Sequence, residues 1–275
     1  MRLHRRWWRR IGGAAVSAVL AACLWSFWWE PASLTVDEES ITLPWSLQGP
    51  LRVAILTDLH VGSPFNGIAK LRDVVDRTNE ARPDVISILG DLVIQGVIGG
   101  RFVPPEEIAN ELKRLRASAG VVAVLGNHDA WLDHDRVENA LERNGIRVLE
   151  ETAARFVTPS GTLWVAGISD LWTGVHDIPT ALAAVTDDSA PVILLTHNPD
   201  VFPLVPDRVA LTLVGHTHGG QVRIPLVGRP IVPSRFGQRF PPAISSKAVV
   251  ISMWPPVSER AFCRYVFACP RPLRS

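Results

Sequence analysis

The stretch LRVAILTDLH, residues 51–60, joins a short apolar run to polar residues that can bind a metal. Similar apolar runs, rich in β-branched residues, recur at 84–89, 121–125, 163–168, 192–196 and 210–214. Such runs are typical of strands covered on both faces. Helical patterns lie between them, near 68–80, 105–117, 134–144 and 179–185. Strands that alternate with helices predict a layered α/β architecture.

The composition fits one catalytic domain with a short extension. The chain has 275 residues, 47% hydrophobic and 20% charged, which is enough apolar material for a large core and argues against disorder. The net charge is +1 and the body has no basic excess, so we expect no nucleic-acid partner. The three cysteines, Cys23, Cys263 and Cys269, lack zinc-finger spacing and predict no disulfide framework.

The first 30 residues predict a membrane anchor or signal segment. Five arginines within residues 1–10 precede Ile11–Trp29, which carries no charge and is long enough to span a bilayer as a helix. This charge distribution favours a single-pass protein of the cytoplasmic membrane with its body on the extracytoplasmic side. Two alternatives remain open: Leu20–Cys23 resembles a lipoprotein processing box, and the arginines loosely resemble a twin-arginine export signal. Residues 31–50 are interpreted as a linker that ends in a short extended piece.

Polar side chains follow five of the predicted strands. They are Asp58 with His60, Asp91, Asn127 with His128 and Asp129, His197, and His216 with His218. Ligands of α/β sheets gather beyond the carboxyl ends of the strands, so these residues are predicted to share one crevice. Turn chemistry explains the Asp, Asn and Gly of any one group, but it does not explain a histidine after four of the five strands. Carboxylates and imidazoles without thiolates suit manganese, iron or zinc, and Asp91, on an expected central strand, is the best candidate to bridge two cations.

In order, these groups read DLH (58–60), GDLV (90–93), GNHD (126–129), THNPD (196–200) and GHTHGGQ (215–221). This set closely resembles the calcineurin-like metallophosphoesterase superfamily over about residues 51–235. The last motif and the N-terminal segment resemble its bacterial membrane-associated phosphodiesterase branch. The resemblance implies an α/β fold in which helices flank a two-sheet β-sandwich, in four layers. Here one N-terminal transmembrane helix is expected to precede that fold.

The resemblance also implies roles for the individual residues. One divalent metal ion would be held by Asp58, His60, Asp91 and His218, and a second by Asp91, Asn127, His197 and His216. His128 would contact the phosphate and protonate the leaving oxygen. Asp129 would either orient His128 or cap a helix. Gly219 and Gly220 would allow a tight turn after the last ligand.

The C-terminal residues depart from the family pattern. We expect a catalytic domain at 51–240 and an atypical tail at 241–275, which lacks the usual closing strand, Gly-rich turn and Arg-Phe. Codons chosen for residues 263–270 can be read one base out of frame as Leu-Pro-Val-Arg-Phe-Arg-Val-Pro, much like the family ending. We therefore hypothesise a frameshift between about residues 238 and 262. Loss of the closing strands would expose a sheet edge.

The sequence thus predicts a phosphoesterase that cleaves phosphomonoesters or phosphodiesters by a two-metal mechanism with a metal-activated hydroxide. One alternative is a pyrophosphatase acting on a nucleotide-linked glycolipid or a membrane phospholipid, since the anchor would hold the site near the bilayer. Another is an inactive metal-binding scaffold, which the complete ligand set disfavours. The pocket walls are expected from loops 62–67, 94–104, 130–134 and 169–178. Trp131 and Trp172 are candidates to line the pocket, but we expect each to pack beneath a loop.

Overall fold

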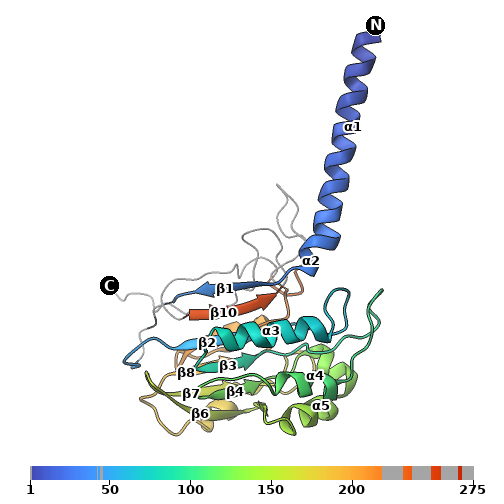
Figure 1. Cartoon of the computed structure of the whole chain (residues 1–275). Helices are drawn as coiled ribbons and strands as arrows, with labels where there is room; N and C mark the ends of the chain where they lie inside the picture. The colour runs from blue at the N-terminus through green and yellow to red at the C-terminus, as the bar shows by residue number, and fades with distance from the viewer. Residues whose placement is uncertain are drawn as a thin grey trace, which may run out of the picture.

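The computed structural model describes residues 2–41, 43, 46–218, 232–236, 249–254 and 266–267. Its body contains two β-sheets (Figure 1). The first has the strand order β1 (Thr35–Glu39), β10 (Val249–Trp254), β2 (Arg52–Leu56), β3 (Val85–Ile88), β4 (Gly120–Ala123) and β5 (Arg147–Val148). Its pairs are parallel except for β1 with β10. The strand β3 therefore lies between two parallel neighbours, at the position expected for the strand that precedes Asp91.

The second sheet has the order β11 (Val266–Phe267), β9 (Val209–Leu213), β8 (Val192–Leu195), β7 (Gly161–Gly167) and β6 (Thr152–Thr158). The strands β7, β8 and β9 pair in parallel, while β6 and β11 pair antiparallel at the two edges. Because β8 and β9 are parallel neighbours, the residues that follow them start from the same edge of this sheet.

Helices cover the outer faces of the two sheets. The first sheet packs against α3 (Ile68–Glu80), α4 (Pro105–Leu112) and α5 (Asn127–Glu142), and the second packs against α6 (Ile178–Ala183). A third apolar cluster fills the space between the sheets. Along β2, Ala54 and Leu56 face the helices whereas Val53 and Ile55 face the other sheet. Burial on both faces explains why this strand carries no polar alternation in the sequence.

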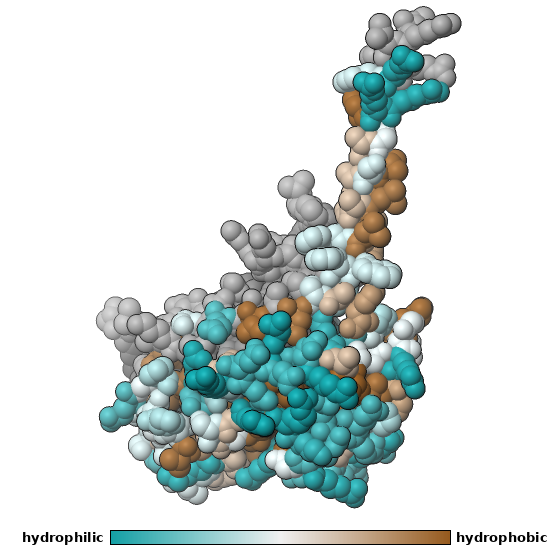
Figure 2. Space-filling view, in the orientation of Figure 1, coloured by the Kyte–Doolittle hydropathy of each residue, from teal (hydrophilic) through white to brown (hydrophobic). Residues whose placement is uncertain are grey.

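The N-terminal helix α1 (Arg2–Leu24) leaves the body and continues through a π-helical segment, Trp25–Trp29, into the short α2 (Glu30–Ala32) (Figure 1). Residues Arg6–Trp29 are long and apolar enough to cross a membrane. The apolar side chains of α1 are exposed along its length, as the brown surface in Figure 2 shows. The body does not bury this helix. In this respect α1 differs from α3, α4 and α5, each of which packs one face against a sheet.

The predicted two-sheet sandwich flanked by helices is confirmed. Each predicted strand corresponds to an observed strand whose ends agree within two residues. The helix predicted at 134–144 is longer, because α5 begins at Asn127 and continues through an extended residue, Asp133, with φ −179° and ψ 98°. This kink divides α5, and only its second part has the periodicity that the sequence pattern detects. The strands β5, β6, β10 and β11 were not predicted.

The predicted linker (31–50) and the predicted tail (241–275) each contain strands that belong to the two sheets. Within 31–50, interpreted as a linker with a short extended piece, Thr35–Glu39 forms the edge strand β1. Within the tail, β10 pairs with β1 and β2, and β11 pairs with β9. Most of 238–262, where the frameshift is hypothesised, lies outside the described residues, as do Gly219 and Gly220.

Candidate metal centre

Hydrogen bonds of the backbone N–H groups join the loops that follow β2, β3 and β9. After β2, the Asp58 N–H donates to the Gly90 carbonyl at 3.0 Å and the His60 N–H donates to the Asp91 carbonyl at 2.9 Å. Between the sheets, the His216 N–H donates to both Asp58 carboxylate oxygens, at 3.0 and 3.1 Å. Asp58 therefore fixes the position of the loop after β9 in addition to its own loop.

The loops that follow β3 and β4 pack closely against each other at two glycines, Gly90 and Gly126. A Cβ on Gly90, whose φ is +85°, would lie 2.3 Å from the Gly126 nitrogen, and a Cβ on Gly126 would lie 2.3 Å from Asp91 Oδ1. No side chain fits at either position without displacing backbone or the Asp91 carboxylate. The glycines of the Gly-Asp and Gly-Asn motifs thus allow Asp91 and Asn127 to lie side by side.

Several candidate ligands have a backbone conformation that is rare outside glycine. Nine non-glycine residues in the described ranges have positive φ, and five of them are candidate ligands: Asp58 (51°), His60 (39°), Asp91 (55°), His216 (70°) and His218 (48°). Each such residue costs of order 1–3 kcal/mol, and such strain concentrates at functional sites because the surrounding structure enforces it. The fold thus accepts a cost in stability in order to direct these side chains to one place.

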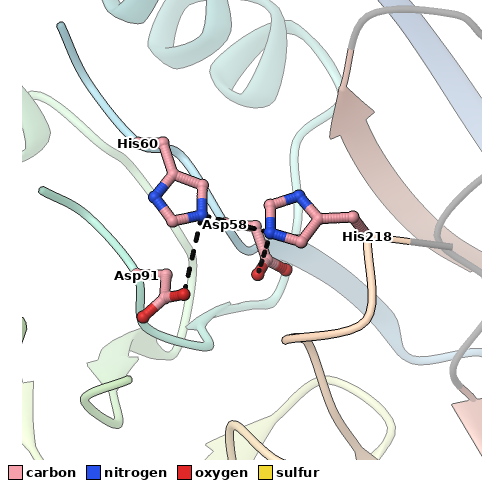
Figure 3. Close-up of side chains that lie close together, drawn as sticks. All are labelled: Asp58, His60, Asp91 and His218. Carbon is pink, nitrogen blue, oxygen red and sulfur yellow. Dashed lines mark hydrogen bonds and ion pairs between the residues drawn. The ribbon is translucent and has the colours of Figure 1, made fainter. Parts of the chain in front are cut away.

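Four of the predicted ligands form one cluster, drawn in Figure 3: Asp58, His60, Asp91 and His218. The nitrogen His60 Nε2 lies 3.2 Å from His218 Nε2 and 3.5 Å from Asp91 Oδ2, and His218 Nε2 lies 3.6 Å from Asp58 Oδ1. The two imidazole rings are stacked with 5.0 Å between their centroids. All four ligand atoms lie within 4.8 Å of one another, which is compatible with coordination of one ion.

A second cluster contains Asp91, His197 and His216, so the two clusters share Asp91. The nitrogen His197 Nε2 lies 3.2 Å from Asp91 Oδ2. Asn127, the first residue of α5, is buried, with 2% of its surface exposed. The structure thus brings together the carboxylates and imidazoles of the predicted set in two groups, and it buries Asn127 on the loop adjoining Asp91.

The hydrogen bonds of the histidines fit a set of metal donors. The Nδ1–H of His60 donates to the Val93 carbonyl at 3.1 Å, and that of His197 donates to the Leu89 carbonyl at 2.6 Å. Metal-binding histidines are oriented by such bonds, which leave the Nε2 lone pair for the cation. Within the described residues, His216 Nε2 and Asn127 Oδ1 are buried without a hydrogen-bond partner. Burying unpaired polar atoms is costly, and a cation would satisfy both.

The electrostatics of the centre follow from burial and from its opposite charges. Burial raises the pKa of Asp91, but neighbouring His197 outweighs that effect and holds the pKa below its usual range. Burial lowers the pKa of His197, but its contact with Asp91 and the charges of Asp58 and Asp170 together outweigh burial and raise the pKa to about 10. Burial and the nearby His197 lower the pKa of His216 to about 4, and burial also lowers that of His60. Both His60 and His216 therefore offer neutral imidazole lone pairs near neutral pH.

His128 lies beside the first cluster, and its orienting partner is Gln95. The rings of His128 and His60 meet edge to face with 4.9 Å between their centroids. The Nδ1–H of His128 donates to Gln95 Oε1 at 2.8 Å, while Gln95 Nε2 donates to the His128 carbonyl at 2.6 Å. The second bond fixes which end of the amide faces the ring, and therefore the tautomer of His128. The sequence analysis missed Gln95, because a glutamine in a loop matches no motif.

Asp129, for which two roles were open, contacts backbone rather than the His128 ring. Its carboxylate accepts N–H groups from Asp91 (2.7 Å), Leu92 (2.9 Å) and Gly126 (3.0 Å). Burial and the Asp91 charge raise the pKa of Asp129, and these N–H groups oppose the rise. The bond to Gly126 belongs to a capping box at the start of α5. Asp129 therefore corresponds to the helix-capping alternative and in addition holds the loop that carries Asp91.

Trp131 and Trp172 were expected to pack beneath loops, and that expectation is wrong. The two side chains are 56% and 47% exposed. The Trp131 ring lies 5.1 Å from the ring of His128, and the Trp172 ring lies 4.4 Å from that of His216. Both indoles therefore stand at the surface next to the candidate centre.

Comparison of the sequence with known proteins shows the family of the chain. The profile of the family described as Calcineurin-like phosphoesterase matches residues 51–220, which include every candidate ligand. The chain belongs to this family. The predicted superfamily is thereby confirmed.

Two curated relatives show how far the similarity extends. Phosphodiesterase YaeI of Escherichia coli is 33% identical over 188 residues, covering 67% of this chain and 66% of the relative. A transmembrane protein with metallophosphoesterase domain from Danio rerio is 34% identical over 207 residues, covering 70% of this chain and 45% of the relative. The chain thus spans about two thirds and less than half of these two proteins.

Proposed function

We propose that the protein hydrolyses phosphomonoesters or phosphodiesters with two divalent cations. The observation that carries this proposal is the pair of clusters that share Asp91. One cation would be held by Asp58, His60, Asp91 and His218, and the other by Asp91, Asn127, His197 and His216. Bound there, the cations would supply the Lewis acidity that activates a water molecule for in-line attack on phosphorus. Oxygen and imidazole donors fit manganese, iron or zinc.

The residues of the chain perform the remaining tasks. Asp58, Asp91 and the imidazoles give the centre its charge and fix its position, because the loops that carry them are joined by the backbone bonds described above. His128 lies next to His60 with its Nδ1–H held by Gln95, so its Nε2 is the nitrogen available to a substrate. A proton on that nitrogen would pass to the leaving oxygen when the phosphorus–oxygen bond breaks.

The test uses the full-length chain purified in detergent and supplied with manganese. It is expected to cleave p-nitrophenyl phosphate or bis-p-nitrophenyl phosphate. Asp91→Asn should lower kcat/KM by about a thousandfold, because metal stabilisation of the transition state amounts to several kcal/mol. The matched control is Asp73→Asn on the exposed face of α3. Equal activity of the Asp91 variant and the wild type would rule out the proposal.

We further propose that α1 anchors the protein in the cytoplasmic membrane, with the body on the extracytoplasmic side. Support comes from the exposed apolar surface of α1 and from the arginines before it. The base of the anchor also touches the body near the site. The Trp28 ring lies 5.4 Å from Phe65, in the loop after β2, and Lys70 Nζ donates to the Ala32 carbonyl at 2.7 Å. Protease added to intact cells should cut the body, and full protection of the body would contradict this orientation.

The contact of Trp28 with Phe65 also favours a second candidate function, cleavage of a lipid-linked phosphoester or pyrophosphate. Since Phe65 follows His60 by five residues, the anchor would hold the metal centre close to the headgroup layer. Kinetics in mixed micelles separate the two candidates. A lipid-linked substrate should be turned over much faster than its water-soluble headgroup ester, and equal rates would leave only the soluble-ester function.

A further inference from the structure

Two exposed tryptophans link the imidazoles of His128 and His216 through a chain of ring contacts. The rings of Trp131 and Trp172 lie nearly parallel, with 6.3 Å between their centroids and an interplanar angle of 21°. Trp131 also contacts His128, and Trp172 meets His216 edge to face. The two indoles therefore form a continuous aromatic surface from the candidate proton donor to the second metal cluster. We call this pair the aromatic wall.

The backbone on which Trp172 stands is firmly held. Asp170 Oδ2 accepts the Trp172 N–H at 2.8 Å, and the Asp170 carbonyl accepts the Gly174 N–H at 2.8 Å. Glu151 Oε1 accepts the Ser169 hydroxyl at 2.7 Å. A Cβ on Gly174 would lie 2.2 Å from Ser169 Oγ, so this turn is closely packed. Trp172 is thus displayed by an ordered turn rather than by a loose loop.

Trp131 is positioned by the first part of α5. It follows His128 by three residues, which places both side chains on the same face of the helix. The two rings are tilted by 60°. An indole that is more than half exposed gains little from burial in the fold. Its exposed place beside a candidate catalytic imidazole leaves its surface available to a ligand.

We propose that the aromatic wall binds a planar ring carried by the leaving group of the substrate, such as an aryl or nucleobase group. This inference rests on the proposed function and narrows its substrate class. The leaving group is the relevant side, because Trp131 contacts His128, whose proposed task is to protonate the leaving oxygen. Stacking of a base on an aromatic side chain contributes about 1–3 kcal/mol to binding. A ring at the wall would therefore increase kcat/KM roughly tenfold or more.

The test compares two methyl phosphodiesters that differ only in the leaving alcohol. One carries p-nitrophenol and the other a fluorinated aliphatic alcohol of matched acidity, so the chemical reactivity of the two is alike. The full-length, manganese-loaded protein is assayed as wild type, Trp131→Ala, Trp172→Ala and the two Trp→Phe variants. The control is Leu204→Ala, which removes an apolar side chain that is 63% exposed on the 3-10 helix Pro199–Leu204.

Each alanine variant should lower kcat/KM for the aryl ester about tenfold, mainly through KM, and change it less than twofold for the alkyl ester. Each phenylalanine variant should retain most of the aryl preference, since a ring face remains. Leu204→Ala should behave as the wild type. Equal losses on the two esters, or no loss on the aryl ester, would overturn the inference while leaving the proposed function intact.

A wild-type protein that cleaves neither diester and also fails to cleave p-nitrophenyl phosphate would instead refute the proposed function. Binding then tests the wall by itself, with the non-hydrolysable phenylphosphonate and methylphosphonate measured by calorimetry. The wall predicts tighter binding of the phenyl compound, and this preference should disappear in Trp131→Ala and Trp172→Ala. Equal affinities of the wild type for the two phosphonates would contradict it.

Discussion

Replacing Gln95 by leucine should impair the proton transfer assigned to His128. Gln95 makes two hydrogen bonds to this residue, at 2.8 Å to its ring and 2.6 Å to its carbonyl. Leucine is similar in size but neither accepts the Nδ1–H nor donates to the carbonyl. The imidazole would lose both its orientation and its fixed tautomer.

The size of the effect follows from those two bonds. At about 0.5–1.5 kcal/mol net for each, their loss amounts to roughly 1–3 kcal/mol. If the loss falls on the transition state, kcat decreases by about 5- to 150-fold. General acid catalysis is itself worth about 10²–10⁴-fold, so Gln95→Leu should remain less harmful than His128→Ala.

The assay measures kcat for diesters whose leaving alcohols have low and high pKa values. A leaving alcohol of high pKa must be protonated as it leaves, whereas p-nitrophenol leaves readily as the anion. The variant should therefore lose activity mainly on an ester of an unactivated alkyl alcohol and little on the p-nitrophenyl ester. The double variant Gln95→Leu/His128→Ala should be no slower than His128→Ala. Gln48→Leu, at an exposed glutamine elsewhere, is the control. Equal losses on both esters, or multiplying effects in the double variant, would refute this role of Gln95.

Three further predictions concern stability. Gly90→Ala should lower the free energy of unfolding in urea by about 2–4 kcal/mol, because the new Cβ overlaps the backbone and the residue has positive φ. Gly145→Ala, which has φ +78° but open space around it, should lower it by only about 1 kcal/mol. Equal losses in the two variants would disprove the close approach of the loops. A chelator should lower Tm, and manganese added at 100 times its Kd should raise the free energy of unfolding again by about 2.7 kcal/mol. No change in Tm would mean that the folded chain binds no metal. Burial lowers the pKa of His134, but Asp135 and Glu150 outweigh it and raise this pKa. The stabilisation is therefore present below the ordinary pKa and lost at higher pH, so His134→Gln should lower Tm at pH 6 and hardly at pH 9, and the reverse pattern would contradict this assignment.

The layered fold was predictable because its strands are buried on both faces. Residues such as Ala54 and Ile55 point to opposite layers, yet both are apolar, so the strands appear as unbroken apolar runs. The strands β1 and β6 lie at sheet edges, where burial is partial and the pattern is correspondingly weak. The kink at Asp133 likewise hid the first part of α5.

The candidate ligands were predictable because each follows a strand directly and the strand determines its direction. Gln95 and the aromatic wall were not, since their roles depend on contacts between segments that follow different strands. Gln95 comes from the loop after β3 and meets α5, while Trp172 comes from the loop after β7 and meets Trp131. Spacing in one sequence carries no information about such encounters, whereas distances in the structure show them.

The central claim is that seven side chains hold two cations with Asp91 between them. Anomalous scattering from crystals of the manganese-loaded protein tests it most directly. The account predicts two peaks about 3.5–4 Å apart on either side of the Asp91 carboxylate. One peak should lie beside His60 and His218, and the other beside His197 and His216. A single peak away from Asp91, or no peak in a well-folded crystal, would contradict it.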